Sequence, residues 1–319
     1  MNQEPCKVAV TSRSFSKHEG LRNELLKRYP ETDFNDSGES LSGQRLVEFL
    51  SGHTKAITAL ETLDEPILKQ LPELQVISKY GVGLDMLDLT TMSSLGKKLG
   101  WTSGVNRRSV SELALSFMIA SLRHLPYSQK EIFAGRYRQI QGRELTGKTV
   151  GIIGCGNIGK DLVKILKPFN CQILVNDIVS NAEFLLNNKI LAVSKEELLS
   201  NSDLVTLHVP LNDSTRGMIG TEELKLMKQN SVLINTARGW LVDETALLNG
   251  LKNGKPGVAA FDVLAQEPPE NYELINHDHF FVSPHIGGST EESIWAMGKA
   301  AIDGLDAGME PSEFLLHYG

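Results

Sequence analysis

Short runs of hydrophobic, often β-branched residues alternate along the chain with longer segments whose apolar residues recur at helical spacing. In the N-terminal third these runs are residues 7–11, 55–59 and 75–80, each of a length that suits a buried strand. From residue 149 the alternation tightens. Six further apolar runs follow at 149–154, 171–177, 203–209, 231–237, 257–263 and 280–285. Strand–helix alternation of this kind predicts parallel sheets that are covered by helices on both faces.

The segment 109–125 lies between the two blocks of strands and is apolar at helical spacing. It predicts a long helix, with Ser109 or Ser111 as a possible N-cap. The two blocks, together with a length of 319 residues, predict two α/β domains.

Composition narrows the class of protein. Hydrophobic residues make up 41% of the chain, enough for a large core, and the formal net charge of −7 disfavours nucleic acid as a partner. We expect neither a signal peptide nor a membrane segment, because no apolar run approaches about 18 residues. Cys6, Cys155 and Cys171 are too few and too scattered for a disulfide framework or a metal site, which favours reduced thiols and a cytoplasmic protein.

The segment TVGIIGCGNIGK (149–160) combines a strand, a glycine-rich turn with Gly154, Gly156 and Gly159, and the start of a helix. The next apolar run ends in Asp177, 18 residues after the last of these glycines. This context is typical of a dinucleotide site, where the glycines let the backbone approach a pyrophosphate and the helix N-terminus supplies free N–H groups. Asp177 suits ribose hydroxyls, and DIVSNAEF offers no Arg or Lys for a 2′-phosphate, so the sequence favours NAD over NADP.

Polar residues follow the carboxyl ends of three late strands. SVLINTARG delivers Arg238, GVAAFDVLAQEPP delivers Asp262 and Glu267, and FFVSPHIGG delivers His285. Each residue alone is consistent with an ordinary surface charge, a solvated loop or a strand end. Because neighbouring parallel strands bring their carboxyl ends together, we expect these side chains to converge.

Together these residues suit hydride transfer to or from nicotinamide. The cofactor carries the hydride, so the protein must move a hydroxyl proton and hold an anionic substrate. A histidine beside a carboxylate suits proton transfer, which makes His285 the expected acid/base and Glu267 its partner. The planar fork of Arg238 suits a carboxylate next to the reacting carbon.

The chain resembles the NAD-dependent D-2-hydroxyacid dehydrogenases, and among them the D-3-phosphoglycerate dehydrogenase-like branch. Seven ordered blocks across nearly the whole chain carry the resemblance. They are SKYGVGLDMLD (78–88), GVNRRSVSELAL (104–115), LTGKTVGIIGCGNIG (145–159), HVPLNDSTRGMIG (208–220), LINTARGWLVDETALLNGL (233–251), AAFDVLAQEPP (259–269) and SPHIGGST (283–290).

The resemblance implies a Rossmann NAD-binding domain, residues 104–288, inserted into a flavodoxin-like substrate domain formed by residues 1–103 and 289–319. It implies that Arg238 orients the substrate, that His285 is the acid/base paired with Glu267, and that the substrate is a small 2-hydroxyacid or 2-oxoacid. The backbone of Tyr80, Gly81 and Val82 would offer N–H groups to the substrate carboxylate. The implied cofactor contacts are Val82, Gly154, Gly156, Asn157, Ile158, Gly159, Asp177, Val209, Thr236, Asp262 (to the carboxamide) and Gly288. A homodimer joined through the inserted domain, around residues 133–145, is also implied.

One loop departs from the phosphoglycerate dehydrogenase pattern. Where those enzymes usually carry an arginine for the phosphate, this chain reads ITALETLDEP, with Glu61 and no basic residue before Lys69. A phosphate dianion needs cationic partners, so the loop favours an unphosphorylated 2-hydroxyacid over 3-phosphoglycerate.

Two other functional hypotheses are consistent with Arg238, Glu267 and His285. One is a cofactor-sensing regulator of the corepressor kind on the same fold, which turnover without any partner protein would exclude. The other is a dehydrogenase that oxidises a phosphorus acid, which a substrate screen would separate from a hydroxyacid dehydrogenase.

Overall fold

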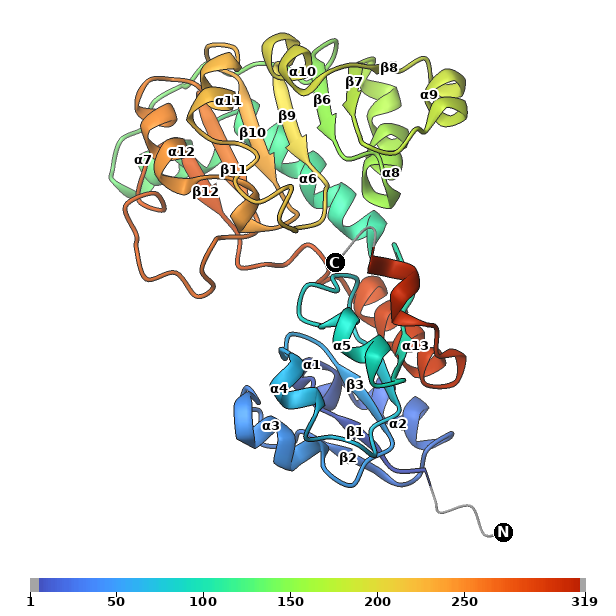
Figure 1. Cartoon of the computed structure of the whole chain (residues 1–319). Coiled ribbons are helices and arrows are strands. Elements are labelled where there is room, and N and C mark those ends of the chain that lie inside the picture. The colour runs from blue at the N-terminus through green and yellow to red at the C-terminus, as the bar shows by residue number, and fades with distance from the viewer. Residues whose placement is uncertain (1–5, 316–319) are drawn as a thin grey trace. The chain divides into compact units, whose positions relative to one another are not determined.

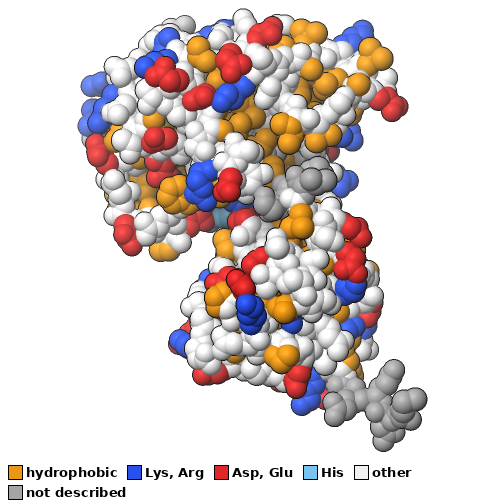
Figure 2. Space-filling view, in the orientation of Figure 1, with side chains coloured by type: hydrophobic (Ala, Val, Ile, Leu, Met, Phe, Trp, Pro, Cys, Tyr) orange, Lys and Arg blue, Asp and Glu red, His pale blue; other side chains and the backbone are white. Residues whose placement is uncertain are grey.

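The computed structural model describes residues 6–315, and the chain forms two compact units (Figure 1). Unit 1 contains Met1–Asn106 and Ser289–Gly319, and unit 2 contains Arg107–Gly288. Unit 2 is therefore an insertion in unit 1 along the chain. Within residues 6–315, no helix combines the length and the apolar character needed to span a membrane. On the face that Figure 2 shows, acidic and basic side chains are interspersed.

A five-stranded parallel sheet forms the centre of unit 1, in the order β2-β1-β3-β4-β5. This order is flavodoxin-like and doubly wound. The strands are β1 (Val8–Val10), β2 (Thr32–Phe34), β3 (Lys55–Thr58), β4 (Val76–Lys79) and β5 (Lys98–Gly100). The helices are α1 (Arg13–Lys17), α2 (Glu19–Leu26), α3 (Gly43–Leu50), α4 (Glu65–Leu68), α5 (Leu89–Ser94), α13 (Glu291–Ala307) and the 3₁₀ turn η3 (Pro311–Phe314).

Each face of this sheet buries its own apolar cluster, one shared with α3, α4 and α5 and the other with α2 and α13. Helix α13 approaches the sheet closely, since a Cβ built on Gly100 would lie only 2.3 Å from the Gly304 carbonyl oxygen. The Ser78 hydroxyl donates to the Ala301 carbonyl at 2.6 Å. The helix that follows the insertion thereby completes the core of unit 1.

Unit 2 contains a seven-stranded parallel sheet in the order β12-β11-β10-β9-β6-β7-β8. Counted within the unit, this is the Rossmann order 3-2-1-4-5-6 with one further strand. The strands are β6 (Thr149–Ile153), β7 (Gln172–Asn176), β8 (Leu191–Ala192), β9 (Leu204–Leu207), β10 (Val232–Asn235), β11 (Val258–Phe261) and β12 (Phe280–Val282). The helices are α6 (Arg107–Leu122), α7 (Leu125–Phe133), α8 (Asn157–Leu166), α9 (Ala182–Asn188), α10 (Lys195–Asn201), α11 (Thr221–Leu226), α12 (Glu244–Lys252), and the 3₁₀ turns η1 (Lys167–Phe169) and η2 (Gly239–Leu241).

Helices α6 and α8 cover one face of this sheet, and α10, α11 and α12 cover the other (Figure 1). Helix α6 begins at Arg107, so the predicted N-cap at Ser109 or Ser111 is wrong. Both serines lie inside the helix and reach other segments. Ser109 donates to the Gly287 carbonyl at 2.5 Å, and Ser111 donates to the Ile158 carbonyl at 3.2 Å. Helix α6 therefore supports both the glycine turn and the loop that carries His285.

Candidate active site

The glycine turn after β6 has the close approaches that a pyrophosphate site needs. Gly154 has a φ of +94°, and a Cβ there would lie 2.5 Å from the His208 carbonyl oxygen. A Cβ on Gly159 would lie 2.3 Å from the Gly154 carbonyl oxygen, which shows how tightly α8 packs on the turn. Gly156, the N-cap of α8, faces open space. The turn and the first N–H groups of a ten-residue helix, beginning at Asn157, therefore fit the phosphates of a dinucleotide.

Asp177 follows β7 and is tied to this turn. Its Oδ2 accepts a hydrogen bond from the Cys155 N–H at 2.6 Å, and its Oδ1 accepts one from the Val179 N–H at 2.8 Å. The carboxylate is thereby fixed beside the glycines, where the ribose next to the pyrophosphate would lie. Burial, and then the charge of Asp177, raise the pKa of the Cys155 thiol to about 11, so this cysteine is no candidate nucleophile.

Buried polar atoms without a protein partner lie where β9 and β10 end. The Thr236 hydroxyl and the His208 Nδ1 both belong to this group. Burial lowers the pKa of His208 to about 3, so its ring is neutral. Val209 follows His208 at this same edge of the sheet. Sequence reasoning missed His208, although a histidine that ends a buried strand beside the glycine turn was a usable signal.

His285 and Glu267 form a hydrogen-bonded pair. Nδ1 of His285 lies 2.8 Å from Oε2 of Glu267, and the two side chains are 41% and 38% exposed. Burial by itself would raise the pKa of Glu267, but the hydrogen bonds from His285 and Leu264 and the nearby positive charge of Arg238 lower it on balance. An ionised carboxylate only accepts hydrogen bonds, so Nδ1 carries the shared proton and Nε2 remains for chemistry.

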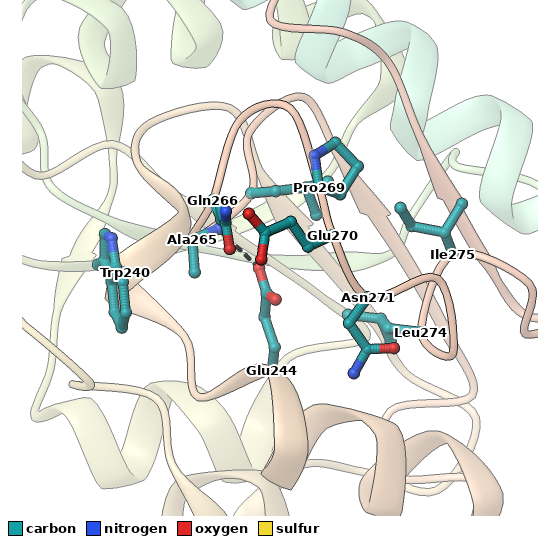
Figure 3. Close-up of a pocket in the computed structure, with 10 residues that line it drawn as sticks. Trp240, Glu244, Ala265, Gln266, Pro269, Glu270, Asn271, Leu274 and Ile275 are labelled. Carbon is teal, nitrogen blue, oxygen red and sulfur yellow. Dashed lines mark hydrogen bonds between the residues drawn. The ribbon is translucent and has the colours of Figure 1, made fainter.

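The loop that carries Glu267 is held at two further points. Oε1 of Glu267 accepts from the Leu264 N–H at 2.9 Å, and Glu244 of α12 accepts from the Ala265 N–H at 2.7 Å. Figure 3 shows the outer side of this loop, where Glu244 and Ala265 line a pocket together with Trp240 and Gln266. Glu244 thus fixes the loop that carries Glu267 to α12, a role that sequence reasoning missed.

Arg238 follows β10 in a turn that a buried asparagine organises. The Asn235 side chain donates to the Arg238 carbonyl at 2.8 Å and accepts from the Ala237 N–H at 3.0 Å. Nη1 of Arg238 donates to the Ala237 carbonyl at 2.7 Å. Sequence reasoning also missed Asn235, although an asparagine inside a buried strand is uncommon unless its amide is hydrogen-bonded, which gave a signal.

Asp262 lies under the His285 loop and is almost fully buried. Its carboxylate accepts hydrogen bonds from the Ser283 hydroxyl, from the Ile286 N–H at 2.8 Å and from the Gly287 N–H at 2.7 Å. The Asp262 carboxylate, which was expected to contact a carboxamide, therefore already accepts three hydrogen bonds from the loop 283–287. Gly288 ends unit 2 directly after this loop.

The predicted substrate loop belongs to unit 1 and follows β4. The Tyr80 N–H donates to the Thr58 carbonyl at 2.8 Å, so it is used within the sheet and is not available to a substrate. The Tyr80 ring packs edge-on against Phe15. Gly81 has a φ of +129°, and a Cβ built there would meet no atom within 4 Å. The expected donors are therefore reduced to Gly81 and Val82.

The structure thus gathers the predicted residues of unit 2 along the carboxyl edge of one sheet. Arg238, Glu267 and His285 follow β10, β11 and β12, while the glycine turn and Asp177 follow β6 and β7. Among the described residues, no group of three or more His, Cys, Asp or Glu side chains could hold a metal ion.

Known proteins share this arrangement of sequence and fold. A family model described as "D-isomer specific 2-hydroxyacid dehydrogenase, NAD binding domain" matches residues 115–287. The hydroxypyruvate reductase of Thermotoga maritima is 34% identical over 308 residues, which cover 95% of this chain and 91% of that protein. The D-3-phosphoglycerate dehydrogenase of Methanocaldococcus jannaschii is 33% identical over 282 residues, which cover 87% of this chain and 54% of that protein. The chain therefore spans about half the length of that relative.

A solved structure extends the likeness to the whole fold. The glyoxylate reductase from Paecilomyes thermophila matches with a TM-score of 0.85 at 26% identity, and the match covers 95% of each chain. The names of these relatives differ in substrate but agree in the class of enzyme. The chain therefore belongs to the D-isomer specific 2-hydroxyacid dehydrogenases, a family of NAD-dependent oxidoreductases.

Proposed function

We propose that this protein interconverts a short, unphosphorylated D-2-hydroxyacid and its 2-oxoacid, with His285 as the acid/base. The observation that carries this proposal is the 2.8 Å hydrogen bond between Nδ1 of His285 and Glu267 at the carboxyl edge of the sheet. Nε2 of His285 gives a proton to the substrate oxygen in reduction and takes it back in oxidation. Glu267 accepts at Nδ1 and stabilises the imidazolium form.

The remaining residues hold the reactants. The glycine turn and Asp177 bind NAD, Thr236 and Val209 lie along it, and when NAD is bound its nicotinamide supplies or accepts the hydride. Arg238 binds the substrate carboxylate. The positive charge of Arg238 also helps to lower the pKa of Glu267, which supports the proposal that the two side chains belong to one site.

The preference for an unphosphorylated substrate rests on Glu61. It lies in the loop after β3, at the same sheet edge as the loop after β4, and its Oε2 accepts from the Ala59 N–H at 2.7 Å. This hydrogen bond holds a carboxylate in a loop where a phosphate would need a cation. Arg13, in the first turn after β1, is an exposed cation at the same sheet edge and stands against this preference.

A substrate panel tests the proposal directly. NADH oxidation would be followed optically with glyoxylate, hydroxypyruvate, pyruvate and 3-phosphohydroxypyruvate, using wild-type protein and the His285→Ala and Glu61→Arg variants. We expect His285→Ala to lower kcat by roughly 10²–10⁴ while NADH still binds, and Glu61→Arg to improve kcat/KM for the phosphorylated substrate alone. A tenfold wild-type preference for that substrate, roughly 1.4 kcal/mol, would overturn the assignment from Glu61.

Exposed apolar side chains support a homodimer joined through α7 and the turn after it. Phe133 and Tyr137 are 81% and 92% exposed, which is unusual for large apolar residues so close together in the chain. The turn between them is fixed, because Arg136 donates to the buried Glu131 through two nitrogens, one at 2.9 Å. A second copy of the chain would cover these two rings.

A further inference from the structure

The loop between β12 and α13 holds His285 in an unusual backbone conformation. His285 has a φ of +55°, in the left-handed region that residues with a Cβ seldom occupy. Its N–H donates to the Asp262 carbonyl at 2.9 Å and to the Ser283 carbonyl at 3.0 Å. A conformation of this kind persists only where the surrounding structure imposes it, so the loop requires an anchor.

Asp262 provides that anchor through several hydrogen bonds. Besides its backbone carbonyl, both carboxylate oxygens bind the loop: Oδ1 accepts from the Ser283 hydroxyl and the Ile286 N–H, and Oδ2 accepts from the Gly287 N–H. The donors therefore lie on both sides of His285 in sequence. On the far side of the loop, the Ser109 hydroxyl donates to the Gly287 carbonyl.

We propose that Asp262 is a positioning residue, whose carboxylate holds the loop 283–287 in the conformation that directs the His285 imidazole toward Glu267. This inference rests on the proposed role of His285 and adds a cause for its geometry. It assigns Asp262 an effect on the proton-transfer step that does not depend on direct contact with the cofactor.

The acceptor requirement makes the proposal specific to a carboxylate. An asparagine at 262 would offer one acceptor oxygen and would turn its NH₂ group toward a backbone N–H of Ile286 or Gly287, so that two donors would face each other. The same contact can be disturbed from the opposite side. A Cβ built on Gly287 would lie 3.0 Å from Oδ2 of Asp262, which is tighter than an ordinary contact.

The test compares Asp262→Asn and Gly287→Ala with a control at a half-buried, hydrogen-bonded carboxylate, Asp203→Asn, whose side chain is 26% exposed. Asp203 accepts from the Thr149 N–H at 2.9 Å and pairs with Lys228 at 3.1 Å, at the opposite end of the same sheet. We expect Asp262→Asn to lower kcat by about 100-fold at saturating NADH, since a displacement of about 1 Å can cost that much. Gly287→Ala should lower kcat by less, because its 3.0 Å contact needs a shift of only a few tenths of an ångström. NADH Kd, measured by fluorescence, should stay within about threefold of wild type. Asp203→Asn should lower Tm and leave kcat unchanged.

A second readout separates positioning from general destabilisation. If the loop directs the imidazole toward Glu267, then Asp262→Asn should move the pH profile of 2-oxoacid reduction in the same direction as Glu267→Gln, and the two changes together should be less than additive. If Asp262→Asn fails to fold, Ser283→Ala removes one donor only and should give the same pattern on a smaller scale, about 5–20-fold in kcat.

The failures are distinguishable. Near-normal turnover in His285→Ala would overturn the proposed function itself. An inactive His285→Ala combined with a fully active Asp262→Asn or Ser283→Ala would overturn only the positioning role. A loss confined to NADH affinity in Asp262→Asn, with kcat at saturation preserved, would also overturn it and would make Asp262 a direct cofactor ligand.

Discussion

Gly239 lies where the loop that carries Arg238 contacts the loop that carries Glu267, and one added methyl group tests that contact. The residue opens η2 directly after Arg238, and its backbone lies against Leu264 and Ala265 in the loop that carries Glu267. A Cβ on Gly239 would lie 1.9 Å from the Leu264 carbonyl carbon and 2.2 Å from the Ala265 nitrogen. The φ of Gly239 is not in the left-handed region, so Gly239→Ala isolates the steric clash.

The size of the effect follows from the distances. To restore a contact of 3.4 Å, the two loops must separate by about 1.5 Å, and movement of this order can lower kcat by about 100-fold or more. The overpacking should also destabilise unit 2 by about 1–3 kcal/mol, which lowers Tm by roughly 4–8 °C for a change of about 2 kcal/mol in a unit of this size.

The assay pairs steady-state NADH oxidation with thermal unfolding, and Gly220→Ala is the matched control. A Cβ on Gly220 would have no neighbour closer than 3.6 Å, so that variant should keep its kcat and lose about 1 kcal/mol or less. Gly239→Ala with wild-type kcat and Tm would refute the idea that this close approach sets the distance between the loops.

Three further outcomes are expected. The pKa of Glu267 is lowered from 4.5, so the wild-type carboxylate stays ionised at neutral pH and accepts the hydrogen bond from His285. Glu267→Gln removes this charge, so 2-oxoacid reduction should decline at a lower pH than in wild type. Superimposable pH–rate profiles would argue against the pairing. Asp177→Ala should raise the Kd for NAD by roughly 10–100-fold and relax the preference over NADP, and an unmodified protein with equal kcat/KM for both cofactors would rule this out. Phe133→Ser with Tyr137→Ser should shift the light-scattering mass from dimer to monomer, and a wild-type protein that is monomeric at micromolar concentration would refute the homodimer.

Much of the fold could be predicted because most strands contain a continuous run of apolar residues. All nine apolar runs correspond to strands within the described residues, from β1 to β12. The three strands that the pattern missed, β2, β5 and β8, lie at sheet edges. Edge strands pair on one side only and can be short, as TDF, KLG and LA are with three, three and two residues, so their sequences carry little hydrophobic signal.

The site was predictable to the extent that its residues act through their own side chains. Arg238, Glu267 and His285 each follow a predicted strand, and parallel topology brings such positions to one edge. The supporting roles of Glu244 and Asp262 were not predictable in this way, although Asp262 itself was expected at this edge. Glu244 binds a backbone N–H that is 21 residues away, and Asp262 binds N–H groups 24 and 25 residues away. Nothing in local spacing reveals a carboxylate that hydrogen-bonds a distant backbone, because the contact exists only after the strands are ordered.

The backbone of His285 gives a direct test of the strain in its loop. Its left-handed φ of +55° costs a residue with a Cβ about 1–2 kcal/mol relative to glycine. Elsewhere in a fold, alanine is more stable than glycine by roughly 0.5–1 kcal/mol. His285→Gly should therefore be more stable than His285→Ala, which reverses the usual order, although both lack the imidazole and should be equally inactive. A Tm about 2–4 °C higher for the glycine variant, per kcal/mol gained, would reveal the strain that the loop imposes. If the alanine variant is instead the more stable of the two, the backbone at position 285 is not strained, and Asp262 is not needed to hold it in this conformation.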